Sequence, residues 1–193
     1  KRQCRPVGVG LGAGGDQRVG AWPGNGLVQG RLLDLTDLGQ GLDKGFDIFW
    51  TGPKVCSTDY PAAHLKQAAD WLHRKPFLWD NYPVNDGSKA SSFLHLRAFA
   101  NRPAELADLV SGHAVNPMKQ AALSALPLAT LPMSYKLGKQ YDPDKALHAS
   151  LNATCGPQIS AMIQADLPLF QDIGLAQLTP EQMFDTLAIN VNG

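Results

Sequence analysis

The chain has 193 residues, 44% of them hydrophobic, and equal numbers of acidic and basic side chains, which fits one ordinary globular domain with extra segments. A net charge of zero gives no electrostatic reason to expect a nucleic acid or an anionic membrane as a partner. No apolar run reaches the ~18 residues that crossing a bilayer requires, and no secretory signal follows the basic N-terminus.

The thiols of the chain are Cys4, Cys56 and Cys155. An odd, widely spaced set matches neither a disulfide framework nor a zinc pattern, so we expect no metal and no cofactor. Together with the missing signal peptide, this favours the cytoplasm. The chain also lacks an initiator Met, which suggests a processed or cut piece of a longer protein.

Residues 1–30 are predicted to be an irregular segment, because they hold nine of the 19 glycines and sustain neither a helical nor an alternating period. Gly10 to Gly15 formally match the G-x-G-x-x-G fingerprint. That motif needs a strand before it and a helix after it. The sequence that follows, DQRVGAWPGNG, is broken by glycine and proline, so we reject a dinucleotide site.

Residues 31–135 are predicted to be an α/β region. Three short apolar runs favour β-strands, and they lie at residues 46–50 (FDIFW), 76–79 (PFLW) and 111–115 (SGHAV). Short strands that recur about every 30 residues, with helices between them, are typical of βαβ crossovers. The sequence therefore predicts a parallel sheet.

Helices are expected between and after these strands. The run 57–74 carries one apolar stripe, formed by Ala62, Leu65, Ala69 and Leu72, with Pro61 in its first turn. A short helix is expected after Pro103. Another is expected to open at the Asn-Pro pair of Asn116, with the asparagine as N-cap, and to end or kink at Pro127.

Residues 136–193 are predicted to be a helical appendage. Three X-Pro pairs look like helix starts, namely Asp142-Pro143, Gly156-Pro157 and Thr179-Pro180. Apolar stripes follow the second and third pairs, formed by Ile159, Met162, Ile163 and Leu167, and by Met183, Phe184 and Leu187. Pro168 is expected to break the middle helix.

The second strand changes abruptly from apolar to polar, in the sequence FLWDNYPVND. Side chains alternate along a strand, which places Phe77, Trp79 and Asn81 on one face and Leu78 and Asp80 on the other. A tryptophan and an asparagine are thus expected to point together from the C-terminal end of the strand.

Polar residues also follow the other strands, with Asn116 after the third and Asp86 in the loop after the second. In parallel α/β folds the ligand site lies at this edge, because the βα loops gather there. We therefore expect Trp79, Asn81, Asp86 and Asn116 to converge on one pocket.

These residue types suit an uncharged sugar ring. An ionised Asp accepts hydrogen bonds, an Asn both donates and accepts them, and a Trp face offers a flat apolar wall. Each also has a structural alternative: Trp79 as a core aromatic, Asn116 as an N-cap and Asp86 as a turn residue beside Gly87. The alternative is weakest for Asn81, because an inward Asn needs a partner.

The histidines His95 and His113 show no ligand-like spacing and are interpreted as structural.

Three segments, DIFWTGPKVCS, LWDNYPVND and GHAVNPMKQAALSALPLATL, resemble consecutive blocks of glycoside hydrolase family 84. That family contains the O-GlcNAc hydrolases and the bacterial β-N-acetylglucosaminidases once called hyaluronidases. The resemblance spans roughly residues 38–145. It implies an α/β fold, the last three or so βα units of a partial (β/α)8 TIM barrel, followed by a helical region.

The resemblance also implies a substrate-assisted retaining mechanism, in which the 2-acetamido oxygen of the sugar attacks the anomeric carbon. By this resemblance, Trp79 matches the aromatic wall of the acetamido pocket and Asn81 an amide of that pocket. Asp86 and Asn116 match residues that bind the sugar hydroxyls. The implied partner is an N-acetylglucosamine-containing glycan or a glycosylated protein.

The family's catalytic pair of adjacent aspartates should lie upstream of the FWTGP block, but the chain contains no Asp-Asp pair. Its catalytic residues are therefore unknown. Two functions remain: a β-N-acetylglucosaminidase part that carries the sugar-binding residues without the acid/base, or a non-catalytic sugar-binding or protein-interaction fragment. An Asp-Asp block in the upstream coding sequence would favour the first.

Overall fold

The computed structural model describes residues 35–177 and 179–181, so the irregular segment predicted over 1–30 and the apolar stripe of Met183, Phe184 and Leu187 lie outside the described residues. The described residues form two compact units. The first consists of residues 35–82 and 100–116, and the second of residues 83–99 and 117 onward. Each unit is described by itself.

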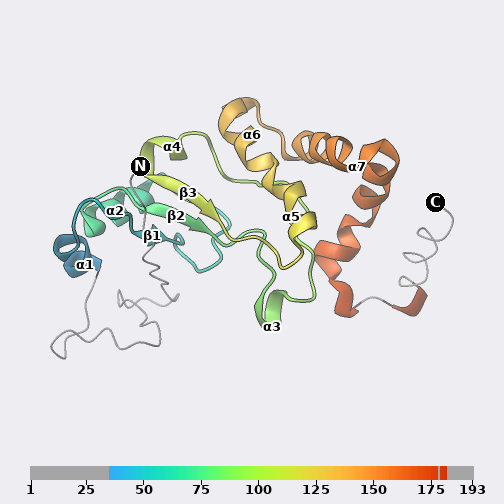
Figure 1. Ribbon diagram of the computed structural model, residues 1–193, viewed down its shortest axis with the longest axis horizontal. Helices are drawn as coiled ribbons and strands as arrows, with labels where there is room; N and C mark the ends of the chain where they lie inside the picture. The colour runs from blue at the N-terminus through green and yellow to red at the C-terminus, as the bar shows by residue number, and fades with distance from the viewer. Residues whose placement is uncertain (1–34, 178, 182–193) are drawn as a thin grey trace. The chain divides into compact units, whose positions relative to one another are not determined.

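The first unit contains a three-stranded parallel sheet. Its strands are β1 (Phe49–Trp50), β2 (Phe77–Asp80) and β3 (Gly112–Val115), in the spatial order β1-β2-β3. Figure 1 shows the strands side by side, and pairing places Phe49 opposite Phe77 and Phe77 opposite Gly112. The three predicted strands and their parallel arrangement are therefore confirmed.

Three helices accompany this sheet: α1 (Leu35–Gly41), α2 (Ala62–Leu72) and α4 (Leu106–Leu109). The predicted start of α2 is wrong. Pro61 is its N-cap, with an extended backbone at φ −59° and ψ 133°. The segment before it forms a turn instead, in which the Ser57 hydroxyl accepts from Lys54 N and donates to Lys54 O.

The buried stripe of α2 differs in part from the predicted one. It consists of Leu65, Ala68 and Leu72, whereas Ala62 is exposed in the first turn.

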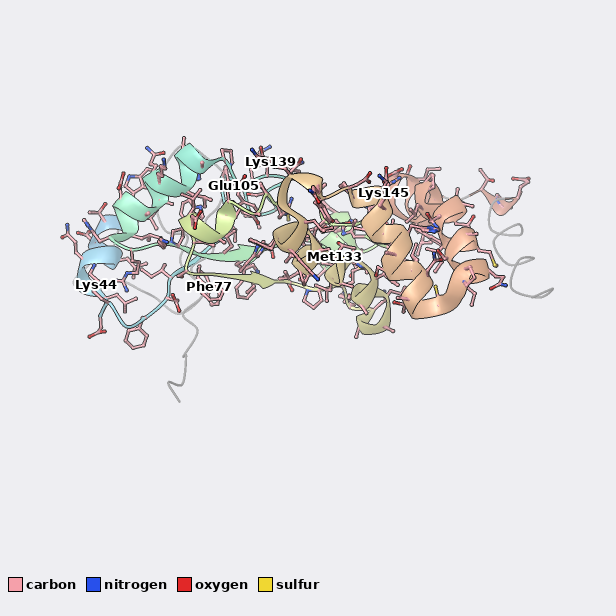
Figure 2. The ribbon with its side chains drawn as sticks, turned by 90° about the horizontal axis from the view of Figure 1, so that it is seen from above. Lys44, Phe77, Glu105, Met133, Lys139 and Lys145 are labelled. Carbon is pink, nitrogen blue, oxygen red and sulfur yellow. The ribbon has the colours of Figure 1, made fainter. Side chains whose placement is uncertain are left out.

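The two faces of the sheet differ in burial. Figure 2 shows α2 and α4 on one side of the strands and Phe77 on the other. Leu78 and Asp80 are fully buried, whereas Phe77 and Trp79 are only half-buried. The Phe49 ring meets the rings of Phe77 and Trp79 edge-on, at 5.0 and 5.2 Å between centroids. The alternation predicted for residues 77–81 is therefore confirmed.

Two glycines of α1 provide a matched test of its packing on α2. A Cβ on Gly39 would lie 2.5 Å from the backbone carbon of Leu72, whereas a Cβ on Gly41 would meet nothing within 4 Å. We expect Gly39→Ala to lower the free energy of unfolding by about 1–3 kcal/mol, because it overpacks against rigid backbone. Gly41→Ala should be neutral or stabilising by up to about 1 kcal/mol. Urea unfolding followed by tryptophan fluorescence would measure the free energy of unfolding of both variants. Equal changes in the two variants would contradict the close packing of Gly39 against the backbone of Leu72.

The second unit is helical. Its helices are α3 (Gly87–Ala90), α5 (Ala121–Leu128), α6 (Thr130–Leu137), α7 (Pro143–Leu167), the 3-10 helices η1 (Gly138–Gln140) and η3 (Leu175–Gln177), and the π-helix η2 (Pro168–Ile173). A hydrophobic core joins α5 and α7 to the loop before them. It is formed by Leu96, Ala98, Met118, Leu126, Leu147, Leu151 and Leu167.

The helix predicted to open at Asn116 starts later. Helix α5 begins at Ala121 with Gln120 at its N-cap, so the N-cap assignment of Asn116 is wrong. The Asn116 side chain donates to Asn81 instead, a partner that is distant in sequence and that local pattern cannot supply. The break expected near Pro127 is confirmed, because α5 ends at Leu128 and α6 follows.

The helix starts at Asp142 and Gly156 are confirmed. Asp142 caps α7, its carboxylate accepting from Asp144 N and Lys145 N at 3.0 and 3.1 Å. Gly156 has φ 79°, a value outside the helical region, and it divides α7 into two helices across a kink. Pro168 ends α7, as predicted.

The apolar stripe predicted after Gly156 is partly wrong. Leu167 is buried and Ile163 packs against the core, but Ile159 is 49% exposed. Ser160 is buried in its place. After the kink, the helix therefore turns Ser160, Ile163 and Leu167 inward, at the i, i+3, i+7 spacing of one helical face.

Candidate functional site

The structure brings together three of the four predicted site residues at the C-terminal ends of β2 and β3. Trp79 Nε1 donates to Asn81 Oδ1 at 2.9 Å, and Asn116 Nδ2 donates to the same oxygen at 3.1 Å. The backbone supports this contact, because Asn116 N also donates to Asp80 O at 2.9 Å. We call Trp79, Asn81 and Asn116 the amide cluster.

The loop after β1 fixes the orientation of the central amide. Asn81 Nδ2 donates to the carbonyl of Val55 at 2.7 Å. Because an amide oxygen has two lone pairs, the two donors from Trp79 and Asn116 use the full acceptor capacity of Asn81. The Asn81 side chain therefore links the ends of β2 and β3 to the loop after β1.

The amide cluster keeps hydrogen-bonding capacity for a ligand. Asn81 Nδ2 carries a second N–H, and Asn116 has a carbonyl oxygen and a second N–H. Among residues 35–177 and 179–181, no partner occupies these groups. Trp79 is half-buried, and its N–H is committed to Asn81. The cluster can thus offer a ligand one N–H of Asn81, the carbonyl oxygen and one N–H of Asn116, and the aromatic surface of Trp79. The hydrogen bonds within the cluster hold these groups in a fixed orientation.

Asp86 belongs to the second unit, at the N-cap position of α3. Its backbone is extended, at φ −84° and ψ 168°, and its side chain makes no capping hydrogen bond. The residue is exposed. The alternative role of Asp86 as a hydrogen-bonded turn residue therefore finds no support, and its carboxylate can accept hydrogen bonds from a ligand.

A neighbour of Asp86 was missed by the sequence reasoning. Asn85 is buried, and its Nδ2 donates to Phe93 O at 3.0 Å and to Gln120 Oε1 at 2.8 Å. Its Oδ1 accepts from Lys119 N at 3.0 Å. These bonds tie the loop that carries Asp86 to the segment before α5. The sequence signal that could have pointed to this role was the position of Asn85 directly after Pro83-Val84.

A buried ion pair behind β2 was also missed. Arg102 donates from Nε and Nη2 to the two carboxylate oxygens of Asp80, at 2.8 Å each. His113 Nε2 lies 3.2 Å from Asp80 Oδ2 and donates to it, because an ionised carboxylate only accepts. We call Asp80, Arg102 and His113 the Asp80 triad. Both carboxylate oxygens of Asp80 are occupied.

Electrostatics keep Asp80 ionised. Burial alone would raise its pKa, but the hydrogen bonds from His113 and Arg102 outweigh burial and hold the pKa of Asp80 below its ordinary value. Burial would likewise lower the pKa of Arg102, and the bonds to Asp80 raise it. The Asp80 carboxylate and the Arg102 guanidinium are therefore both charged over the whole neutral range.

The remaining N–H groups of Arg102 bind backbone carbonyls. Nη1 donates to Thr58 O at 2.6 Å and to Ala100 O at 2.8 Å, and Nη2 donates to Ser57 O at 3.2 Å. The guanidinium carbon also lies 5.2 Å from the centre of the Tyr60 ring. Arg102 is therefore fully bound.

The interpretation of the histidines as structural agrees with their contacts. His113 binds Asp80, and His95 Nδ1 lies 3.0 Å from the carbonyls of Pro83 and Val84. In the described part of the chain, no three His, Cys, Asp or Glu side chains are grouped so that they could hold a metal ion. Within the same residues, no helix has the length and apolar character needed to cross a membrane.

Comparison with known proteins points to one family. Residues 29–167 match the family described as beta-N-acetylglucosaminidase. Protein O-GlcNAcase of Rattus norvegicus and that of Mus musculus are each 30% identical over 102 residues, which is 53% of this chain and 11% of theirs. The chain thus spans about a tenth of the length of these curated relatives.

Solved structures agree with this match. A mutant of Thermobaculum terrenum O-GlcNAc hydrolase superposes with a TM-score of 0.68 and 34% identity, over 76% of this chain and 31% of that one. CpGH84B gives a TM-score of 0.57 at 22% identity, over 80% of this chain and 26% of that one, and this likeness concerns the fold alone. Because the family match covers most of its residues, the chain belongs to the β-N-acetylglucosaminidase family, glycoside hydrolase family 84.

Proposed function

We propose that this chain supplies the sugar-binding part of a β-N-acetylglucosaminidase, and that the catalytic aspartate pair comes from sequence outside these 193 residues. The observation that carries the proposal is the amide cluster. Its hydrogen bonds hold an aromatic surface and two amides at the C-terminal edge of a parallel sheet, which is the edge where α/β barrels bind their ligands.

In this proposal the sheet is the last part of a (β/α)8 barrel. The strands β1 and β3 each pair with one neighbour among the described residues, and three strands cannot close a barrel that needs eight. Phe77 and Trp79 are half-buried on the face that α2 and α4 leave uncovered. Such a face would be buried inside a complete barrel, because the barrel interior is packed with side chains.

Each site residue has a proposed role toward an N-acetylglucosamine ring. The Trp79 ring forms a wall for the apolar faces of the acetamido group. The free N–H of Asn81 faces the same group, and Asn116 binds ring hydroxyls through its unoccupied amide atoms. Asp86, which belongs to the second unit, is proposed to accept hydrogen bonds from other hydroxyls. Support comes from the fixed amide geometry and from the exposed, uncapped carboxylate.

The proposed chemistry is substrate-assisted and retaining. The acetamido oxygen of the sugar attacks the anomeric carbon, while one aspartate orients the acetamide and the other protonates the leaving oxygen. The residues of this chain hold the ring and exclude water from the acetamide. The printed names of its relatives refer to O-GlcNAc, and we propose an N-acetylglucosamine-bearing glycan or glycoprotein as the substrate.

Tryptophan substitution tests the proposal. We expect the chain to bind N-acetylglucosamine but not glucose, and Trp79→Ala to weaken that binding about ten-fold or more, because a buried aromatic contact contributes about 1.5–3 kcal/mol. Saturation-transfer NMR with a sugar titration measures both effects. The matched control is Trp71→Ala, which removes a partly buried tryptophan from α2.

Two outcomes would overturn this function. The first is that N-acetylglucosamine fails to bind at any concentration while the chain remains folded by circular dichroism. The second is that Trp79→Ala and Trp71→Ala weaken binding equally. Either result would favour a non-catalytic interaction fragment.

A further inference from the structure

We infer that Arg102, anchored by Asp80, is a positioning residue for the sugar site and sets the orientation of the Asn81 amide through the loop after β1. The inference rests on the proposed function where it concerns the sugar. The Asp80 and Asn81 side chains point to opposite faces of the sheet, because Asp80 is the last residue of β2, Asn81 follows it directly and side chains alternate. Arg102 must therefore act around the end of the strand, through the backbone of the neighbouring loop.

The first step of this path runs from Arg102 to the loop. Asp80 fixes the guanidinium through two bonds of 2.8 Å. The remaining N–H groups of Arg102 then donate to the carbonyls of Ser57 and Thr58, at 3.2 and 2.6 Å. Both bonds are charge-assisted, which makes them stronger than neutral hydrogen bonds, and the bond to Ser57 is buried.

The second step runs within the loop. The Ser57 hydroxyl accepts from Lys54 N at 3.0 Å and donates to Lys54 O at 2.9 Å. This closed turn contains Val55 and is separated by Pro53 from Gly52, whose φ of 91° suits glycine. A Cβ on Gly52 would overlap the Ser57 hydroxyl. The position of Ser57 therefore determines the position of Val55.

The last step runs from the loop to the amide cluster. Val55 O accepts from Asn81 Nδ2 at 2.7 Å, and Asn81 Oδ1 accepts from Trp79 and Asn116. An amide can rotate by 180° and exchange its oxygen and nitrogen. The Val55 carbonyl holds it one way, because only the nitrogen can donate to it. If the loop after β1 moved, Asn81 would lose its hydrogen bond to Val55 O. The amide would then be less firmly oriented toward the residues proposed to bind the sugar.

A second arginine provides a matched control. Arg74 also binds several backbone carbonyls, but those of Gly39, Leu42, Asp43 and Phe46, which precede β1. It therefore fixes the opposite end of the sheet. In both positions, Lys keeps the charge and loses the planar fork of donors to backbone carbonyls, although only Arg102 also bonds to a carboxylate.

The test measures hydrogen exchange at the Trp79 indole N–H by NMR in the sugar-free chain, with the buried helix amide of Ala68 as an internal reference. Arg102→Lys should speed exchange at Trp79 about ten-fold relative to Ala68, the effect of weakening one hydrogen bond. Arg74→Lys should leave that ratio unchanged. An unchanged ratio in Arg102→Lys, or equal changes in both variants, would overturn the inference.

Sugar titration separates this inference from the proposed function. If the parent chain binds N-acetylglucosamine, Arg102→Lys should weaken binding about ten-fold, and unaltered affinity would overturn the positioning role. If the parent chain does not bind the sugar, the function fails, while the exchange ratio still decides whether Arg102 orients the cluster. Should Arg102→Lys not fold, Ser57→Ala removes the hydroxyl that closes the turn and must raise the Trp79 exchange ratio in its place.

Discussion

Asp80→Asn is expected to lower the free energy of unfolding of the first unit by about 3–5 kcal/mol at pH 7, the cost of breaking a buried pair by removing one partner. Asp80 is fully buried and Arg102 nearly so. Asparagine has nearly the same shape, but it leaves the Arg102 charge without a counter-charge in a region that water does not reach. Urea unfolding followed by tryptophan fluorescence measures the loss.

The pH dependence of this effect has a definite sign. The folded state holds the pKa of Asp80 below its ordinary value, so the unfolded state binds a proton more readily. The stability from Asp80 is therefore fully present above the unfolded-state pKa of about 3.9. It is lost as pH falls through the lower folded-state pKa. The difference between wild type and Asp80→Asn should be constant from pH 7 to about pH 5 and shrink below pH 4.

An exposed pair serves as the matched control. Asp172 bonds to Arg97 at 2.7 Å within the second unit, but its side chain is 54% exposed. We expect Asp172→Asn to cost less than about 1 kcal/mol, as is usual for surface ion pairs. A cost for Asp80→Asn as small as that for Asp172→Asn would contradict the buried ion pair of Asp80 and Arg102.

Local pattern was sufficient for the elements that place the amide cluster. The runs at Phe49 and Phe77 are short and rich in β-favouring residues, and alternation with a period of two put Trp79 and Asn81 on the same face. The parallel arrangement followed from spacing alone. These features depend on residues that are close together in the sequence, so the sequence alone was enough to predict them.

Features that depend on distant partners could not be predicted. Asn116 looks like a helix cap because an Asn-Pro pair is a frequent helix start, but Asn81 competes for its side chain from 35 residues away. Asp80 and Arg102 lie 22 residues apart, and no periodicity links them. The alternation did indicate that Asp80 points away from Trp79. Only the fold shows that the buried guanidinium of Arg102 bonds to Asp80 on that face.

The second large effect concerns catalysis: these 193 residues alone should not hydrolyse a β-N-acetylglucosaminide at a measurable rate. General acid/base assistance contributes about 10²–10⁴-fold, and the loss of two carboxylates that act together exceeds the loss of one without being simply additive. Asp80 cannot substitute for them, because both of its oxygens are bound and its lowered pKa keeps it ionised at neutral pH. A general acid must carry a proton at the pH of the reaction.

Asp86 is the remaining carboxylate of the proposed site, and it is exposed and makes no capping hydrogen bond. One exposed carboxylate cannot replace two carboxylates that act together. Incubation of the purified chain with a chromogenic β-N-acetylglucosaminide should therefore release no chromophore above the buffer rate. The control is Asp86→Asn, which should also leave that rate unchanged. Turnover that Asp86→Asn abolishes would place the acid within this chain and assign Asp86 a catalytic role in place of hydroxyl binding.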